Sequence, residues 1–305
     1  MFTTLIVQPI FNLLVLIYSL IPGHNFGLAI ILFTVVIRLL MWPLVKKQLH
    51  HAKAMRSLAP ELKKIKASAA GDRQKQSKLT MELYKAREIN PFASLGVVLI
   101  QLPIFIGLYF AVKRLIDKPQ EIIDFSYPLL HDLSWLKSLE TNILQFDSSL
   151  FGIVDLGRKA IGVEGVYVPA LILVALSAIV QYYQSKQLMP APKEARSLRS
   201  ILSSASQGKA ADQEEVNAAV GRSMLILIPL LVFIFGLNFP AALPLYWLTS
   251  SFVAFVQQTK ILRADAEEAV AIVATPEEEK ATKPKKGKSG KSKSSRNRSR
   301  KRKRR

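Results

Sequence analysis

Long apolar stretches without charged residues constrain this chain more than any other feature of its sequence. Four such stretches are present, and only one of them contains a charge, Arg38. A helix crosses the hydrocarbon core of a bilayer in ~20 residues, so the longest stretch, with 37 residues, can hold two helices. Pro240 lies near the middle of that stretch and favours a turn there. The sequence therefore predicts five spanning helices, drawn from residues 27–45, 93–112, 167–185 and 223–259.

The predicted fold class is an all-α polytopic membrane protein. Residues 1–22 are apolar, but Gln8, Asn12 and Ser19 fall on one helical face. This pattern favours an interfacial amphipathic helix, with a sixth span as the alternative. Transmembrane helices are expected at 23–45, 91–112, 167–185, 223–239 and 240–260, a cytoplasmic helical hairpin at 46–90, an extracytoplasmic loop at 113–166, a cytoplasmic loop at 186–222 and a disordered basic tail at 261–305.

The net charge of +20 is unusual for a chain that is half apolar, and its distribution predicts the topology. Residues 46–90 hold 12 Lys or Arg against 4 Asp or Glu, and residues 260–305 hold 17 against 6. Residues 113–166 hold 6 against 8, whereas residues 186–222 hold 6 against 4. Basic segments remain in the cytoplasm. We therefore expect the 113–166 loop outside and the C-terminus inside.

The two most basic segments indicate anionic partners. In the 46–90 segment, Met55, Leu58, Leu62 and Ile65 predict an amphipathic helix, and Asp72 is a candidate N-cap of a second helix. The basic face of this predicted hairpin can bind anionic lipids, or it can dock a client or targeting factor, and the sequence leaves both possibilities open. The tail is too polar to fold and can bind the ribosome, other nucleic acid or lipid. Its candidate binding residues are Arg296, Arg298, Arg300, Lys301, Arg302, Lys303, Arg304 and Arg305.

Residue types that carry enzyme chemistry are scarce. The chain has no cysteine, and its four histidines are scattered without partners at metal-ligand spacing. No nucleotide-binding loop or catalytic constellation is recognisable. We expect no catalytic residue, no metal and no cofactor, and a protein that is not an enzyme.

Arg38 lies well inside the first predicted span. An arginine there costs ~2.5–3.5 kcal/mol on insertion scales and normally faces protein or a water-filled cavity. It can instead snorkel to the cytoplasmic headgroups. Other polar or aromatic span residues are each explained by ordinary packing, but together with Arg38 they suggest a polar groove open to the cytoplasm. They are Thr34, Gln101, Gln181, Gln184, Tyr246 and Trp247.

Four sequence blocks resemble the YidC membrane protein insertase family. They are TVVIRLLMWPL, SLAPELKKIK, ELYKAREINPFASLGVVLIQLPIFIGLY and FPAALPLYWLTSSF. The resemblance covers roughly residues 5–260 and implies a five-helix core with a cytoplasmic hairpin and a hydrophilic groove. It places Arg38 and Thr34 in the groove, Tyr246 and Trp247 as the aromatic pair of the last helix, and Gln184 on the lining of the third.

The resemblance implies an insertase of the bacterial cytoplasmic membrane that inserts and helps to fold client membrane proteins. Its partners would be nascent membrane proteins, anionic lipids and the ribosome through the basic tail. The Sec translocon and the signal recognition particle pathway are further candidates. The chain lacks the family's large periplasmic domain, and its 113–166 loop is longer than usual. An anion channel or small-solute transporter remains the alternative, and a membrane anchor that tethers RNA is a third possibility.

Deletion of residues 276–305 tests the predicted role of the tail. Loss of the polycation should weaken cosedimentation with ribosomes, most visibly at low salt, while the core retains insertion activity. Complete loss of activity would instead favour the RNA tether.

Overall fold

The computed structural model describes the chain except for residues 91–94, 189–199, 202, 204–212 and 275–305. The chain divides into two compact units, Met1–Arg263 and Ala264–Arg305. Within the second unit, only the last turns of a helix ending at Ala274 are described. Most of the predicted 186–222 loop lies outside the described residues, as do the eight basic residues chosen in the tail.

The described residues are mostly helical. Four helices are long and apolar enough to cross a membrane, and a bent pair raises the number to five. The four are Thr3–Leu20, Leu99–Asp117, Val168–Gln187 and Ala219–Gly236. The long helices are α1 (Gln8–Leu20, preceded by the π-helical turn η1, Thr3–Val7), α2 (Phe26–Leu40), α3 (Trp42–Ser57), α6 (Leu95–Asp117), α9 (Val168–Leu188), α11 (Gln213–Gly236) and α12 (Ala242–Ala274).

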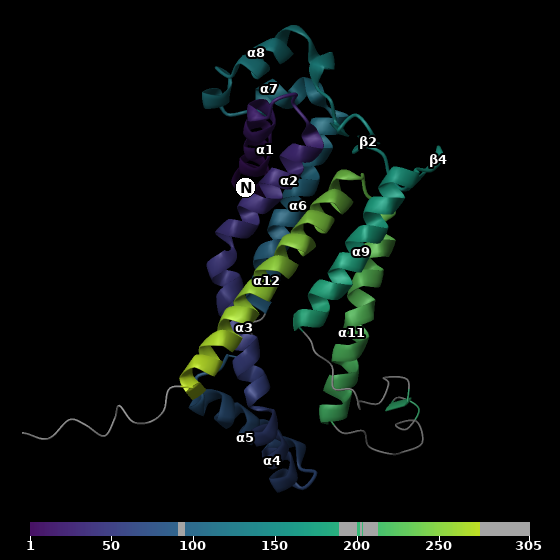
Figure 1. Ribbon diagram of the computed structural model, residues 1–305. Coiled ribbons are helices and arrows are strands. Elements are labelled where there is room, and N and C mark those ends of the chain that lie inside the picture. The colour runs from purple at the N-terminus through teal and green to yellow at the C-terminus, as the bar shows by residue number, and fades with distance from the viewer. Residues whose placement is uncertain (91–94, 189–199, 202, 204–212, 275–305) are drawn as a thin grey trace, which may run out of the picture. The chain divides into compact units, whose positions relative to one another are not determined.

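Helix α12 is not among these candidate spans, although the sequence predicts a span at 240–260. Its first turns carry several serine and glutamine residues, which lower its hydropathy, and many of them are buried. In the first unit, α12 runs diagonally between α2 and α6 on one side and the α9–α11 pair on the other (Figure 1), and its side chains bond residues of α2, α6 and α9. Two assignments remain predictions: residues 1–22 to the membrane interface, and residues 240–260 to a transmembrane span.

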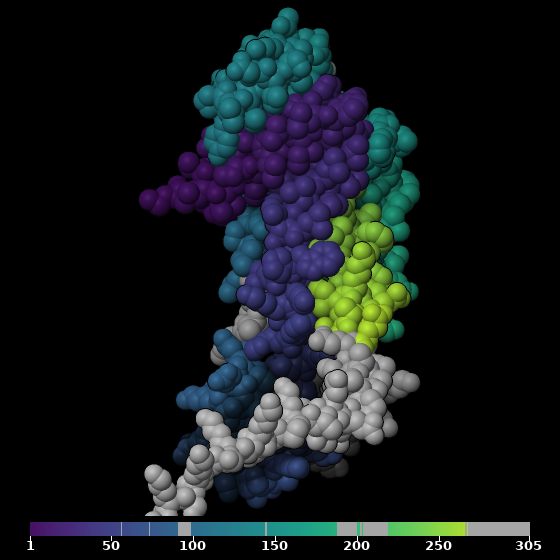
Figure 2. Space-filling model, turned by 60° about the vertical axis from the view of Figure 1, so that its left-hand side comes forward, coloured from purple at the N-terminus to yellow at the C-terminus, as the bar shows by residue number. Residues whose placement is uncertain are grey.

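The N-terminal helix crosses α6 closely at Gly107. A Cβ at this glycine would lie 2.7 Å from side-chain atoms of both Ile6 and Ile10, so only glycine fits without a shift. Figure 2 shows the N-terminal end of the helix projecting sideways from the rest of the unit. The crossing places the first residues of the chain beside the C-terminal half of α6.

The bent pair consists of α2 and α3, which meet at 57°. Pro43 follows the break, and it lacks the N–H that would continue the helix ladder. Beyond α3 lie α4 (Ala59–Ala69) and α5 (Arg73–Ala86), which pack together. The Asp72 carboxylate accepts from the N–H groups of Gln74 and Lys75, which confirms it as an N-cap. The helix predicted through residues 55–65 is divided at Leu58, because a new helix begins at Ala59 with Pro60 in its first turn.

The 113–166 segment packs against α1 through Trp135 and Asp147. The Trp135 ring packs edge-on against Tyr18 of α1, with ring centroids 4.7 Å apart. The Tyr18 hydroxyl donates to the Asp147 carbonyl and accepts from the Asp147 N–H. The segment contains η2 (Pro119–Glu121), α7 (Ile122–Phe125), η3 (Pro128–Leu130), α8 (Ser134–Thr141), η4 (Ile143–Gln145) and two antiparallel hairpins, β1 (Ser149–Leu150) with β2 (Val154–Asp155) and β3 (Ile161–Gly162) with β4 (Gly165–Val166).

Replacement of Gly27 by alanine should destabilise the contact between α2 and β1. Its Cβ would lie 2.6 Å from the Cβ of Leu150 and 3.0 Å from its Cα, and backbone cannot move aside cheaply. We expect a loss of about 1–3 kcal/mol, read as a lower midpoint of thermal unfolding in detergent. Gly221→Ala is the matched control. No atom lies within 4 Å of its Cβ position, so this change within α11 should be neutral or stabilising. Equal destabilisation by both variants would contradict the steric argument.

Candidate functional site

Arg38 is bonded to a serine of α12. Its Nε and Nη2 atoms both donate to the Ser250 hydroxyl oxygen, at 2.8 and 2.6 Å. The Gln257 amide donates to the Arg38 carbonyl oxygen at 2.9 Å. That carbonyl belongs to the last turn of α2, where a helix leaves carbonyl groups without a helical partner. Thus α12 holds both the side chain and the backbone of Arg38.

The position of Arg38 suits a cation. It lies in the last turn of α2, where the helix dipole favours positive charge. Its partner in the described structure is a hydroxyl rather than a carboxylate. A hydroxyl orients the guanidinium without neutralising it, so the charge remains available to an anionic group.

Two aromatic residues of α12, Tyr246 and Trp247, contact α6 about one turn before Ser250. Tyr246 is buried one turn before Ser250 on α12, and its hydroxyl accepts from the Gln101 amide of α6. Trp247 stacks on Phe105 of α6, with ring centroids 5.0 Å apart and planes 7° from parallel. Helix α12 therefore contacts Arg38 of α2 through Ser250 and Gln101 of α6 through Tyr246, whereas Trp247 packs on Phe105 of α6.

Gln181 and Gln184 form a separate cluster between α9 and α12. The Gln181 amide donates to Gln184 Oε1 at 2.8 Å and to the Ser185 hydroxyl at 3.1 Å. Its own carbonyl oxygen accepts from Ser251 of α12 at 2.8 Å. These glutamines therefore join α9 to the neighbouring face of α12.

Thr34 is fully buried, and its hydroxyl donates to the Ile30 carbonyl of its own helix at 2.6 Å. This bond satisfies the hydroxyl proton locally. The assignment of Thr34 to the groove stays a prediction.

Sequence reasoning missed Ser250, Ser251 and Gln257. A signal was present, because Tyr246, Ser250 and Gln257 fall at i, i+4 and i+11 and share one helical face. Serine and glutamine in an apolar run are common, so the signal gains weight only from the partner helices.

Several buried acceptors of this region have no hydrogen-bond partner within the described structure. The amide oxygens of Gln101, Gln257 and Gln258 belong to this group, together with that of Gln187. A buried acceptor without a partner costs about 1–3 kcal/mol. These buried oxygens are therefore acceptors that no group of the described structure uses.

The bond between Arg38 and Ser250 can be measured with a double-mutant cycle. Arg38→Met and Ser250→Ala should show a coupling of about 1–2 kcal/mol in the free energy of unfolding, because each removes the same bond. A control cycle pairs Arg38→Met with Ser177→Ala, whose hydroxyl donates instead to the Leu173 and Pro244 carbonyls. Additive effects at Arg38 and Ser250 would show that this bond does not form.

Comparison with known proteins gives the family. Residues 16–268 match the 60Kd inner membrane protein family. The chain is 31% identical to the membrane protein insertase MisCA of Bacillus subtilis, over 90% of this chain and 82% of that protein. It is 28% identical to the membrane protein insertase YidC of Laribacter hongkongensis, over 87% of this chain but only 38% of that protein. It is 30% identical to ALBINO3-like protein 1, chloroplastic, of Arabidopsis thaliana, over 77% of this chain and 42% of that protein.

The match to the family covers most of the chain, and it includes most of α12 and all of α2, α6 and α9. These helices hold the polar residues described above, called here the polar cluster: Arg38, Gln101, Gln181, Gln184, Tyr246, Ser250, Ser251 and Gln257. The relatives from bacteria carry the names YidC and MisCA, in agreement with the resemblance of the sequence blocks. The chain belongs to the 60Kd inner membrane protein family, that of the YidC and MisCA membrane proteins.

Proposed function

We propose that this chain is a membrane protein insertase, which inserts client membrane proteins and helps them to fold. The names of its relatives support this activity. The observation that carries its mechanism is the Arg38 guanidinium, which is oriented by the Ser250 hydroxyl with no carboxylate taking part in that bond.

Arg38 receives an anionic group of the client. A client helix slides along the lipid-facing side of α2 and α12, and its short acidic flank is drawn to the guanidinium. Removing a charged group from water without a partner is costly, and an unneutralised arginine lowers that cost during the crossing. Because the attraction is to one charge only, the client is released again.

Water and the unpartnered amides complete a hydrophilic groove open to the cytoplasm. The amide oxygens of Gln101, Gln257 and Gln258 accept hydrogen bonds from water or from the client backbone. Tyr246 and Trp247 contact the apolar part of the client helix. The groove shortens the distance that a polar segment has to cross in hydrocarbon. The membrane potential then contributes ~2.3 kcal/mol per charge for each 100 mV.

The protein resides in the bacterial cytoplasmic membrane with its C-terminus in the cytoplasm. Nascent membrane proteins are its clients, the ribosome is bound by the basic tail, and anionic lipids bind the basic hairpin. The Sec translocon and the signal recognition particle pathway are candidate partners. The chain acts without a cofactor and is not an enzyme.

A charge reversal tests this mechanism. In a strain depleted of its own insertase, Arg38→Glu should reduce insertion of clients with an acidic flank about tenfold, which corresponds to a loss of ~1.4 kcal/mol of attraction. Clients with a neutral flank should be affected less. Insertion is read from protease protection of the translocated segment, with the membrane level of each variant measured alongside.

Two further variants make this test specific. Lys137→Glu reverses an exposed lysine that pairs with Asp132 in the 113–166 segment, and it should leave insertion unchanged. Ser250→Ala keeps the positive charge but frees the guanidinium, so it should give a smaller loss than Arg38→Glu. Unchanged insertion of acidic clients by Arg38→Glu would contradict the electrostatic role. Anion flux through the purified protein in liposomes, without any effect on clients, would favour a channel or transporter.

A further inference from the structure

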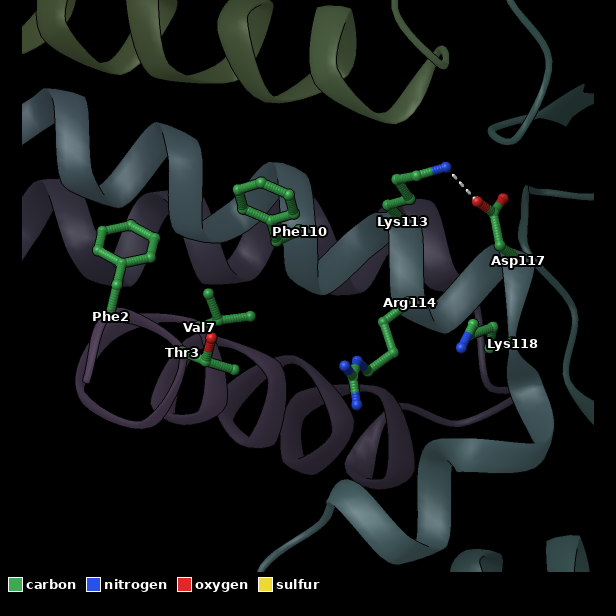
Figure 3. Close-up of a pocket in the computed structure, with 8 residues that line it drawn as sticks. All are labelled: Phe2, Thr3, Val7, Phe110, Lys113, Arg114, Asp117 and Lys118. Atoms are coloured by element: carbon green, nitrogen blue, oxygen red, sulfur yellow. Dashed lines mark hydrogen bonds and ion pairs between the residues drawn. The ribbon is translucent and has the colours of Figure 1, made fainter.

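A cavity of about 510 Å³ lies between the N-terminal helix and the end of α6. It is far along α6 from Gln101 and contains none of the residues of the polar cluster. Figure 3 shows its two sides: aromatic rings of Phe2 and Phe110 on one, and the cations Lys113, Arg114 and Lys118 on the other. A cavity that is apolar on one side and cationic on the other fits an amphiphile with a negative headgroup.

The apolar side is continuous with the surface that would face lipid. Phe110 is 48% exposed, and Leu102, two helical turns earlier on α6, is also exposed. On the N-terminal helix Phe2 and Leu5 are exposed as well. An acyl chain lying along Phe2 and Phe110 would therefore pass directly into the bilayer.

The cationic side lies at the depth of the headgroups. Eighteen residues separate Leu95 from Lys113 on α6, which is ~27 Å at 1.5 Å per residue. The hydrocarbon core is ~30 Å thick, so a helix that enters near Leu95 reaches the opposite interface near Lys113. By the charge-based topology this is the outer leaflet.

The cations of the cavity are only partly neutralised. Lys113 Nζ pairs with the Asp117 carboxylate at 2.5 Å. Arg114 and Lys118 share one carboxylate, that of Glu121, at 3.0 and 2.6 Å. Among the described residues, three cations thus meet two carboxylates in these ion pairs, and one positive charge is left over.

Neighbouring groups keep this arrangement charged and in place. The hydrogen bond from Lys118, with the charges of Lys118 and Arg114, holds the pKa of Glu121 below its usual range, so this carboxylate stays ionised at neutral pH. The Arg114 guanidinium also lies over the Phe125 ring, 4.0 Å from its centroid. In Figure 3 Lys113 points toward Asp117, whereas Arg114 points toward the N-terminal helix. Arg114 is thus anchored at the cavity with N–H groups left to donate.

We propose that this cavity binds one anionic phospholipid of the outer leaflet. The phosphodiester, with a single negative charge, matches the single surplus cation. It lies against Arg114 and Lys118, and an acyl chain follows Phe110 and Phe2 into the bilayer. A zwitterionic lipid offers the same chains but adds a positive headgroup near three cations, and it binds less well. The bound lipid joins the N-terminal helix to α6.

Lipid retention on the purified full chain tests this site. The chain is released from nanodiscs of equal parts phosphatidylglycerol and phosphatidylcholine, and retained lipid is counted by native mass spectrometry. We expect one phosphatidylglycerol to be retained in preference to phosphatidylcholine. Lys113→Gln with Lys118→Gln should reduce that preference, by about fivefold for each charge at ~1 kcal/mol per basic residue.

The controls separate the site from general surface charge. Lys137→Gln removes an exposed, ion-paired lysine outside the cavity and should leave retention unchanged. Lys118→Arg keeps the charge and should keep the lipid. Equal retention of the two lipids, or an equal loss with Lys137→Gln, would overturn the proposal. Displacement of the lipid by millimolar inorganic phosphate would assign the site to a free anion instead. None of these readouts depends on insertion activity, so this proposal and the proposed function can fail separately.

Discussion

Buried polar groups of α12 must find partners, and the arrangement of the other helices depends on this constraint. Unpaired polar groups are costly in an apolar interior and more so in lipid. Ser250 and Gln257 meet Arg38 of α2, while Ser251 meets Gln181 of α9. Tyr246 meets Gln101 of α6. Three helices are therefore brought to one helix by hydrogen bonds rather than by apolar packing alone.

The same constraint is left incomplete around the candidate site, as it is at the indole N–H of Trp135 in the 113–166 segment. Several glutamine oxygens around α12 have no partner among the described residues, and the Arg38 guanidinium bonds a hydroxyl. A fold selected for stability alone would neutralise such groups or replace them with apolar ones. Their retention at the junction of α2, α6 and α12 is consistent with a site that binds polar guests and releases them.

Charge is used differently at the two ends of the bundle. The hairpin of α4 and α5 carries an excess of lysine on exposed faces, whereas the cations at the end of α6 are paired with carboxylates. The second arrangement orients each group, and Glu121 and Phe125 hold Arg114 at one position. The proposed selection between headgroups depends on this orientation, whereas the proposed attraction of anionic surfaces to the hairpin needs only its excess positive charge.

The sequence by itself determined the helical class, the apolar segments and the Asp72 cap, because these depend on local composition and spacing, and it singled out Arg38 as a candidate site residue. It also suggested Gln101, Gln181, Gln184, Tyr246 and Trp247 as a set. Only the tertiary structure decided that Ser250 holds Arg38, that Thr34 bonds its own helix and that Gln181 of α9 bonds Ser251 of α12 rather than Arg38. The physical reason is that a hydrogen bond needs two groups within about 3 Å, and residues 212 positions apart reach that distance only when helices pack.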